Sequence, residues 1–528
     1  MPGCLLSQES RISRAESFPL EGRQTYVFKT AVAQLRFAAS VGFGRPFAQW
    51  SLDQLIDAIK ETKREFGAID AEDGGSQLGG PVLDEETRRE LHLRRFRTQA
   101  VRAAQETSYY AHLFEKHALQ PDRLSFEDIV RLPTTPKEAL REDPGAFVRR
   151  TTTPSFGTTT TGTTNKPTSV YFSAHEMRTY IALAAIGLLA ANRIDESDIV
   201  QLSTSSRATL GNTCLAGACV RIGALVHLAG LIEPLRTLSL LAEERSIPGK
   251  KPKVSYMSIY ASYLGELVEC GLQHGYGPDD FGLERISVGG ELVSEGLKER
   301  ARGLFGPVEV YDDYGMTETW PFQGQSCSEG HLHFDPTSGM LEVIDPETGT
   351  PAGSGQAGTL VATPLPPYRE VTILLRYDTQ DVVRQVEGPL TCNLRNLQAT
   401  SPLLGKLSLA TRQEDGWTFA REVLEALEGA EEVPLPARYG FWAVPGGVAV
   451  EVVARRSAEP RVRRAIETRL GERGVPVRKL NLVEHRGELR RPLPLRCDLK
   501  ESAFGVPAGS GEDVFGLTLE EATRREDL

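Results

Sequence analysis

The chain has 528 residues, of which 40% are hydrophobic and 25% charged, and this ordinary globular composition at such a length predicts two folded units rather than one. A formal net charge of -11 argues against duplex nucleic acid or an anionic membrane as the main partner, because either would favour a basic surface. The most apolar stretch, residues 181–191, is too short to span a bilayer, and the first residues contain no apolar run of signal-peptide length. Seven scattered cysteines do not resemble a secreted disulfide framework, so we expect reduced thiols and a cytoplasmic protein.

Four regions follow one another along the chain. Residues 1–90 predict an N-terminal extension of limited order with one short helix over 52–66. In residues 91–404, strand-like runs alternate first with helices and later with turns, which predicts a large α/β domain with mixed sheets that ends in a β-rich part. Residues 405–500 follow the order helix, strand pair, helix, strand and predict a small C-terminal α/β domain, and the Gly- and acid-rich residues 501–528 predict a flexible tail.

The segment PSFGTTTTGTTNKPT, residues 154–168, places many hydroxyls, two glycines and one lysine on a loop. Glycine permits close backbone approach, threonine hydroxyls donate to phosphate oxygens, and a lysine adds positive charge, so the loop suits a polyphosphate. The alternative is a solvated Thr-rich linker. The segment is not a Walker A loop, because Thr163 stands where that motif needs lysine. The predicted phosphate contacts are Thr160, Thr161, Gly162, Thr163, Thr164 and Lys166.

Within this segment, TTGTTNKPT (160–168) resembles the phosphate loop of adenylate-forming enzymes, although Asn165 stands where that family usually has glycine. Three further segments resemble motifs of the same family and occur in the same order. They are ISVGGELVS (286–294), VYDDYGMTE (310–318) and LLRYDTQDVVR (374–384). The last is altered, with Asp378 for the second arginine and Gln380 for the glycine. Because the order agrees as well as the letters, the chain is identified as a member of this superfamily, with a large domain and a small mobile C-terminal domain.

The resemblance implies a role for each matching residue. Tyr314 would stack on adenine, Glu318 would hold Mg²⁺, and Asp381 would accept hydrogen bonds from the ribose hydroxyls of ATP. The implied catalytic residues are Lys166, Thr317, Glu318 and Lys500. The remaining implied nucleotide contacts are Gly289, Gly290, Glu291, Asp312 and Gly315. The residues near family positions that line the acid pocket are Tyr256, Tyr260, Thr319 and Trp320.

Two more segments, residues 97–119 and 124–140, resemble the branch typified by phenylacetate-coenzyme A ligase, whose members suggest a homodimer. That branch often carries a Cys/His set in one region. Two thiolates and two imidazoles suit tetrahedral zinc, and the candidates here are Cys327, His331, His333 and Cys392. The alternative is that no metal binds, because relatives tend to show paired cysteines where this chain has Cys392 alone.

The C-terminal region departs from a conventional ligase. The position of the family's catalytic lysine falls on Leu495, and Lys500 is the nearest lysine, with Arg490, Arg491 and Arg496 as other cations. Residues 405–406 read Gly-Lys for the usual Gly-Arg, and the acidic hinge sequence that normally follows is missing. These changes bear more on transfer of the acyl group, which needs rotation of the small domain, than on nucleotide binding.

Three functions remain open. The leading hypothesis is an AMP-forming ligase, phenylacetate-coenzyme A ligase-like, that adenylates a carboxylic acid with ATP, releases pyrophosphate and passes the acyl group to coenzyme A or another nucleophile. The second is an ATP-dependent diazo-forming relative that activates nitrite toward an amine in specialised metabolism. The third is a non-catalytic nucleotide-binding protein of the same fold. Retention of Lys166, Thr317, Glu318 and Asp381 argues against the third.

Overall fold

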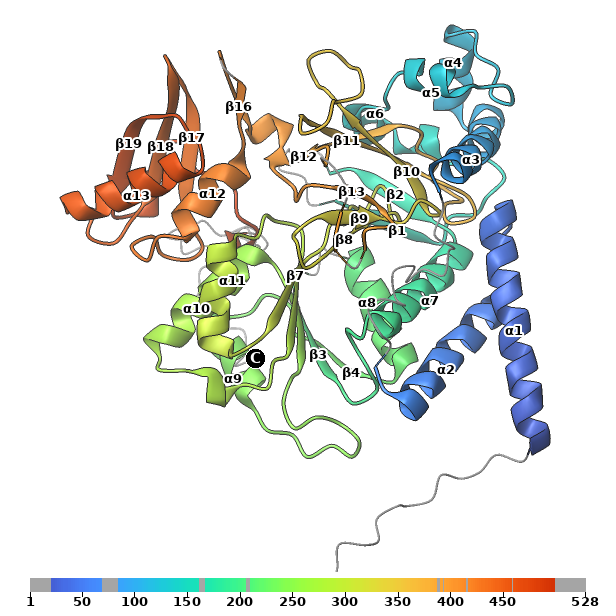
Figure 1. Ribbon diagram of the computed structural model, residues 1–528, viewed down its shortest axis with the longest axis horizontal. Coiled ribbons are helices and arrows are strands. Elements are labelled where there is room, and N and C mark those ends of the chain that lie inside the picture. The colour runs from blue at the N-terminus through green and yellow to red at the C-terminus, as the bar shows by residue number, and fades with distance from the viewer. Residues whose placement is uncertain are drawn as a thin grey trace, which may run out of the picture.

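The computed structural model describes residues 20–68, 84–160, 167–205, 209–386, 390–392, 394–414, 416–457 and 459–498. In Figure 1 the N-terminal helices, in blue, lie at one end of the molecule, and the orange and red C-terminal unit lies at the other. The α/β body between them confirms the predicted fold class of a mixed α/β protein. In the described part of the chain, no helix combines the length and the apolarity that crossing a membrane requires.

A five-stranded parallel sheet with the order β4-β3-β5-β6-β7 forms the centre of the body. Helices cover both faces of this sheet, and for that reason all five residues of β3 are buried. Its strands are β3 (Ile199–Ser203), β4 (Leu225–Leu228), β5 (Tyr256–Ile259), β6 (Arg285–Val288) and β7 (Glu309–Asp312). The covering helices are α7 (Ala174–Ala190) and α8 (Thr209–Ile222) on one face, and α9 (Pro234–Ala242), α10 (Ala261–Gln273) and α11 (Glu295–Phe305) on the other.

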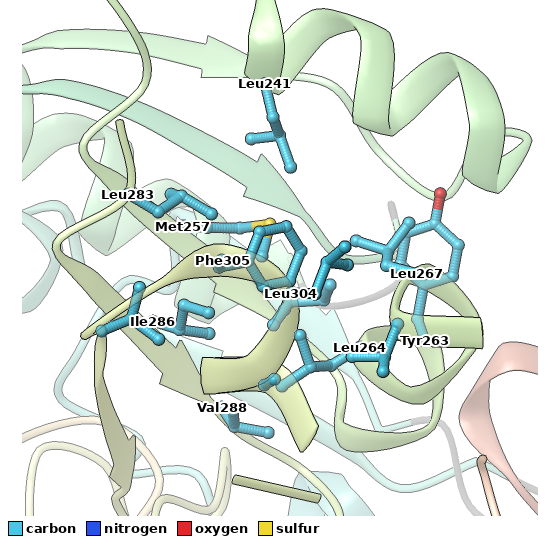
Figure 2. Packing of buried hydrophobic residues seen from close by; sticks show 14 of the residues in the cluster. Leu241, Met257, Tyr263, Leu264, Leu267, Leu283, Ile286, Val288, Leu304 and Phe305 are labelled. Carbon is cyan, nitrogen blue, oxygen red and sulfur yellow. The ribbon is translucent and has the colours of Figure 1, made fainter. Parts of the chain in front are cut away.

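The core between β5, β6 and the second set of helices is shown in Figure 2. Met257 and Ile286 extend from neighbouring strands toward Leu264 of α10 and Leu304 of α11, and all four side chains are fully buried. Complete burial of a leucine or isoleucine contributes about 2 kcal/mol, so this cluster fixes the sheet edge from which the site is built.

Shorter antiparallel sheets follow the parallel sheet, as the sequence predicted. One has the order β10-β11-β12-β14, and another has the order β13-β9-β8. Their strands are β8 (Gly324–Ser326), β9 (Leu332–Phe334), β10 (Gly339–Ile344), β11 (Ala357–Pro364), β12 (Tyr377–Arg384), β13 (Gln398–Thr400) and β14 (Gly405–Lys406). A separate antiparallel hairpin joins β1 (Phe156–Thr159) to β2 (Ser169–Phe172).

The N-terminal part differs from the expected limited order over the described residues 20–68. The predicted short helix is present as α2 (Gln49–Phe66), but a longer helix, α1 (Leu20–Phe43), precedes it and was not anticipated. Phe37 of α1 and Leu52 of α2 are buried in the same apolar cluster as Ile186 of α7, so the pair of helices packs on the body. The helices that follow are α3 (Glu85–Glu106), α4 (Ser108–Lys116), α5 (Phe126–Arg131) and α6 (Lys137–Glu142).

The C-terminal unit shows the predicted order of elements and has an apolar cluster of its own. A hairpin of β15 (Thr411–Gln413) and β16 (Gly416–Thr418) precedes it. The unit contains α12 (Ala420–Glu428), β17 (Tyr439–Val444), β18 (Gly447–Val453), α13 (Pro460–Glu472) and β19 (Val477–Val483). The predicted tail, residues 501–528, lies outside the described residues, and the predicted domain boundaries stay predictions.

Candidate nucleotide and acid site

A cavity of about 920 Å³ opens at the carboxyl ends of β5, β6 and β7. This edge of a parallel sheet is where α/β proteins place ligands, because the loops leaving successive strands converge there. The C-terminal unit also contributes to the wall through residues 493–496. The predicted site residues that line it are Thr160, Tyr256, Tyr260, Gly289, Gly290, Glu291, Asp312, Tyr314, Gly315, Thr317, Glu318, Trp320 and Asp381.

The predicted phosphate loop joins β1 to β2 beside this cavity. The backbone N–H of Thr160 donates to the carbonyl of Thr168 at 2.9 Å and closes the base of the loop. The other predicted phosphate contacts, Thr161, Gly162, Thr163, Thr164 and Lys166, lie outside the described residues, as does Lys500. The structure therefore places the ends of this loop at the cavity and leaves its tip as a prediction.

Glu318 has a cationic partner that the sequence did not reveal. Its side chain is 1% exposed, and Lys137 Nζ, at the start of α6, lies 3.0 Å from Glu318 Oε1. The hydroxyl of Tyr377 donates to the same oxygen at 3.4 Å. Burial of a carboxylate is costly unless a positive charge compensates it. Lys137 supplies that charge here, and a bound divalent cation would be a second source of it.

Asp381 lies between the body and the segment that leads to the C-terminal unit. Lys406 Nζ is 2.7 Å from one carboxylate oxygen, and the hydroxyl of Tyr314 donates to the other at 3.1 Å. The antiparallel pairing of β12 with β14 sets Asp381 directly opposite Lys406. Burial, followed by the nearby charge of Asp381, raises the pKa of Tyr314 well above its usual value, so its hydroxyl stays protonated and acts as a donor. Gln380 has φ +61°, a left-handed backbone that agrees with glycine at the matching family position.

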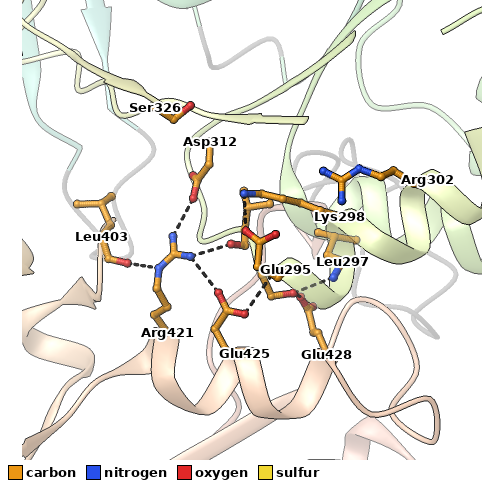
Figure 3. Close-up of polar contacts among 12 residues, drawn as sticks. Glu295, Leu297, Lys298, Arg302, Asp312, Ser326, Leu403, Arg421, Glu425 and Glu428 are labelled. Atoms are coloured by element: carbon orange, nitrogen blue, oxygen red, sulfur yellow. Dashed lines mark hydrogen bonds and ion pairs between the residues drawn. The ribbon is translucent and has the colours of Figure 1, made fainter. Parts of the chain in front are cut away.

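Two residues expected beside the adenine, Asp312 and Glu291, line the cavity and also contact the C-terminal unit. Arg421 of α12 donates to Asp312 at 2.8 Å and to the carbonyl oxygens of Val293 and Leu403, as Figure 3 shows for Asp312 and Leu403. Burial raises the pKa of Asp312, and the charge of Arg421 opposes that rise.

The carboxylate of Glu291 is also held by protein groups. Glu291 Oε2 accepts hydrogen bonds from the backbone N–H and the hydroxyl of Ser262, at 2.8 and 2.7 Å. Its other oxygen accepts from the backbone N–H of Arg496 at 2.6 Å. Asp312 and Glu291 therefore join the two units of the chain, a role that motif comparison did not indicate.

The part of the cavity wall near the predicted acid-pocket residues contains many apolar and aromatic side chains. Tyr256, Tyr260 and Trp320, which were predicted to line an acid pocket, lie in the cavity wall. Thr319 does not, because it is fully buried and its hydroxyl lies within hydrogen-bond distance of the carbonyl oxygens of Met316 and Phe322. Other wall residues are Tyr180, Leu183, Leu188, Leu210, Leu215 and Tyr368.

One buried ion pair also reaches the cavity wall. Arg193, 8% exposed, donates to Asp313, which also accepts from the backbone N–H of Ser326 at 2.9 Å. The guanidinium of Arg193 lies 4.0 Å from the ring centre of Tyr311. This pair could not be recognised from the sequence, because its members are 120 positions apart.

The four predicted zinc ligands converge around β8 and β9. Cys327 Sγ lies 3.8 Å from His331 Nδ1, Cys392 Sγ lies 3.3 Å from His333 Nε2, and all four ligand atoms lie within 4.8 Å of one another. In a tetrahedral zinc site, neighbouring sulfur and nitrogen ligands are about 3.5 Å apart. Burial lowers the pKa of His333 to about 4, which keeps its imidazole neutral, as metal binding requires. The donor set therefore fits a single tetrahedral ion.

A parallel sheet with a cavity at its carboxyl edge, a β-rich part and a small C-terminal unit on the same cavity are the features that the sequence resemblance to the adenylate-forming superfamily predicts. Within it, the chain is similar to phenylacetate-coenzyme A ligases. The enzyme from Thermus thermophilus is 26% identical over 336 residues, which are 62% of this chain and 72% of that protein. The enzyme from Pseudomonas putida is 26% identical over 311 residues, 57% of this chain and 67% of that protein. No protein-family model matches the chain.

Solved structures agree with the fold. 2-Hydroxyisobutyryl-CoA ligase in the postadenylation state, in complex with 2-HIB-AMP, aligns with a TM-score of 0.64 at 20% identity and covers 76% of this chain and 87% of that one. The same ligase with 2-HIB-AMP and CoA in the thioesterification state aligns with a TM-score of 0.55 at 21% identity, over 76% and 87% of the two chains.

Proposed function

We propose that the protein activates a carboxylic acid with ATP as an acyl-adenylate and transfers the acyl group to coenzyme A. The observation that carries this proposal is the single cavity that gathers Thr160, Glu318 and Asp381 at the carboxyl edge of the parallel sheet. A carboxylate oxygen would attack the α-phosphorus of ATP, and the bond to the β-phosphate would break, with its electron pair leaving on pyrophosphate. The thiolate of coenzyme A would then attack the acyl carbon and release AMP.

Each polar residue of the cavity has a role in this proposal. Glu318 would bind Mg²⁺ beside the phosphates, because a buried carboxylate suits a hard cation. Lys137 would then turn from Glu318 toward the phosphate oxygens. It would thus neutralise Glu318 before the nucleotide binds and the phosphates afterwards. Asp381 would accept hydrogen bonds from the ribose hydroxyls while it stays in contact with Lys406. The apolar and aromatic wall favours an aromatic or otherwise bulky apolar acid over a small polar one.

The test is pyrophosphate release from ATP with a panel of arylacetic, benzoic and short aliphatic acids and with nitrite, each with and without coenzyme A. We expect turnover with an aromatic acid that rises when coenzyme A is added. Glu318→Gln should abolish it, whereas Glu347→Gln, an exposed carboxylate remote from the cavity, should not. Turnover with nitrite and an amine acceptor would instead indicate the diazo-forming reaction. Absence of turnover with every acid would support the alternative that the protein binds a nucleotide without catalysing a reaction.

We also propose that the Cys/His cluster binds one zinc ion as a structural site. Its four ligand atoms are already gathered at tetrahedral spacing, and the two thiols would bind as thiolates. Metal analysis of the purified protein should give about one zinc per chain, and Cys392→Ser should lose most of it. Cys270→Ser is the matched control, because Cys270 contacts His274 at 3.6 Å in a two-residue pair that offers too few ligands. Equal zinc content in both variants would contradict the proposal.

A further inference from the structure

We propose that the acid activated by this protein is an elongated apolar one that lies along α7, and that Gly187 in this helix leaves room for its length. The inference rests on the proposed function, because it names the class of the acid that is adenylated. An alkanoic acid with a terminal aromatic ring represents this class. Its carboxylate would face the nucleotide, and its chain and ring would extend toward the far end of α7.

The cavity follows one face of α7 over about three helical turns. Residues on this face recur every three or four positions, as expected for one side of a helix. At a rise of about 1.5 Å per residue, the helix from Tyr180 to Ala191 is about 17 Å long. The cavity therefore extends well beyond the region where the phosphates and the carboxylate of the acid would meet. The residues of α7 and its C-cap in the cavity wall are Tyr180, Leu183, Ala184, Gly187, Leu188 and Ala191.

The parallel sheet gives a second measure of the depth of the cavity. Tyr256 is the first residue of β5 and Tyr260 follows the last, and both line the cavity together with Ser258. The cavity thus reaches from the carboxyl edge of the sheet to the beginning of β5. Helix α7 runs in the same direction, because the segment after it leads into the beginning of β3 at the amino edge.

The first half of α7 is the part nearest the nucleotide site. Ser173 caps α7 directly after β2, the strand that leaves the predicted phosphate loop. Tyr180 belongs to an apolar cluster against which Trp320 packs, and Trp320 lies two residues after Glu318. An acid that presents its carboxylate to the α-phosphate near Glu318 would therefore extend its other end along α7 toward Ala191.

An ion pair in the cavity wall follows the far end of α7. Arg193 donates to Asp313, which also accepts from the backbone N–H and the hydroxyl of Ser326, at 2.9 and 3.0 Å. Because the two charges already compensate each other, the pair does not require a charge on the acid. Leu183 and Leu188 line the wall before it and offer apolar contacts. This part of the cavity therefore suits an uncharged, apolar chain.

Gly187 leaves open space in the middle of this wall. It is half-buried, and a Cβ atom added there would meet no atom from the rest of the fold within 4 Å. Glycine inside a helix weakens the helix relative to alanine, and close packing is a common reason for its presence. Gly217 of α8 is such a case, because an added Cβ would lie 2.9 Å from Ile181 Cδ1. Close packing does not explain Gly187, which instead widens the cavity where the chain of an elongated acid would pass.

The test measures acid-dependent exchange of pyrophosphate into ATP by the full-length protein. The probes are the ω-phenyl derivatives of acetic, butanoic, hexanoic and octanoic acids. In the unaltered protein, kcat/KM should rise along this series, by up to about fourfold for each buried methylene. Gly187→Leu should lower the ratio of kcat/KM for phenyloctanoic acid to that for phenylacetic acid about 60-fold, because the added side chain fills the space of roughly three methylene groups.

Two further substitutions test the direction in which the acid lies. Ala184→Leu places the same side chain about one turn nearer the nucleotide site, and Ala191→Leu places it about one turn farther away. The longest acid accepted should therefore increase in the order Ala184→Leu, Gly187→Leu, Ala191→Leu. Gly303→Leu is the matched control, because Gly303 is exposed on α11 and outside the cavity wall. It should keep the selectivity of the unaltered protein.

Several outcomes would overturn the inference. They are a kcat/KM that is highest with phenylacetic acid in the unaltered protein, an unchanged selectivity ratio in Gly187→Leu, and one common length limit in all three α7 variants. If Gly187→Leu folds poorly, Gly187→Ala gives the same test with a smaller change, since alanine favours the helix. Absence of exchange with every acid would overturn the proposed function itself, and this inference with it.

Discussion

Gly296, in the first turn of α11, lies against the end of α12 at the junction of the two units. A Cβ atom added to Gly296 would lie 2.4 Å from the carbonyl oxygen of Glu428 and 2.6 Å from the backbone N of Gly429. Both are backbone atoms, so no side-chain rotation can relieve the overlap and α12 would have to move. The hydrogen bond from Ser294 to Glu428, 2.5 Å long and buried, would be stretched by that movement. Overpacking costs about 1–3 kcal/mol, and loss of a buried hydrogen bond to a charged group costs about 1.5–3 kcal/mol.

We therefore expect Gly296→Ala to lower the free energy of unfolding by about 3 kcal/mol or to release the C-terminal unit from the body. Urea unfolding monitored by fluorescence and by circular dichroism would detect either outcome, since release would separate the two transitions. Gly303→Ala is the matched control, because Gly303 is exposed on the same helix with no atom within 4 Å of the added Cβ. It should stabilise by about 0.5–1 kcal/mol. A Gly296→Ala protein as stable as the Gly303→Ala protein would refute this account of the junction.

Three further variants test buried charges. Burial raises the pKa of Glu428 from 4.5 to about 7, so the folded state binds more protons than the unfolded state in this range. The free energy of unfolding should therefore fall as the pH rises from about 4.5 to 7. Glu428→Gln should flatten this dependence in urea titrations at several pH values. Arg376 contacts both carboxylate oxygens of Glu342, at 3.0 and 2.9 Å. Arg376→Met should lower the stability measured by thermal unfolding by about 3–5 kcal/mol, because it leaves the Glu342 carboxylate buried and unpaired. A loss below about 1 kcal/mol would show that the ion pair does not contribute in this way. Asp381→Asn should weaken ATP binding about 10- to 100-fold in calorimetry, because a charged acceptor is replaced by a neutral one. An unchanged affinity would indicate that the ribose binds elsewhere.

Much of the fold and the cavity could be predicted because the sequence patterns that indicate them lie within short segments. Strand-like runs and helical periodicity predicted the α/β body, and short motifs predicted that Glu318 and Asp381 would meet in one site. The partners of these residues could not be predicted in the same way. Arg421 and Asp312 are 109 positions apart, and only the docking of α12 on the body joins them.

Missed elements have a related cause. Helix α1 carries apolar residues on its buried face, such as Phe37, and on its exposed face, such as Leu35. A helix that is apolar on more than one side gives a weak amphipathic pattern, so its sequence was not recognised as a helix. Lys137 belongs to a segment that resembles a known branch, but a lysine on a short helix carries no local sign that it will neutralise an acid far along the chain.

The N-terminal helices affect the acid pocket through α7. One side of α7 contributes Leu183 and Gly187 to the cavity wall, and its buried residues pack against α2 and α1. A single helix therefore separates the pocket from the N-terminal pair, and a larger or smaller side chain at Leu52 or Ile56 would shift that helix toward or away from the bound acid. We therefore expect that substitutions in the buried contact between α2 and α7 can change the selectivity of the proposed pocket for acid size without touching the substrate.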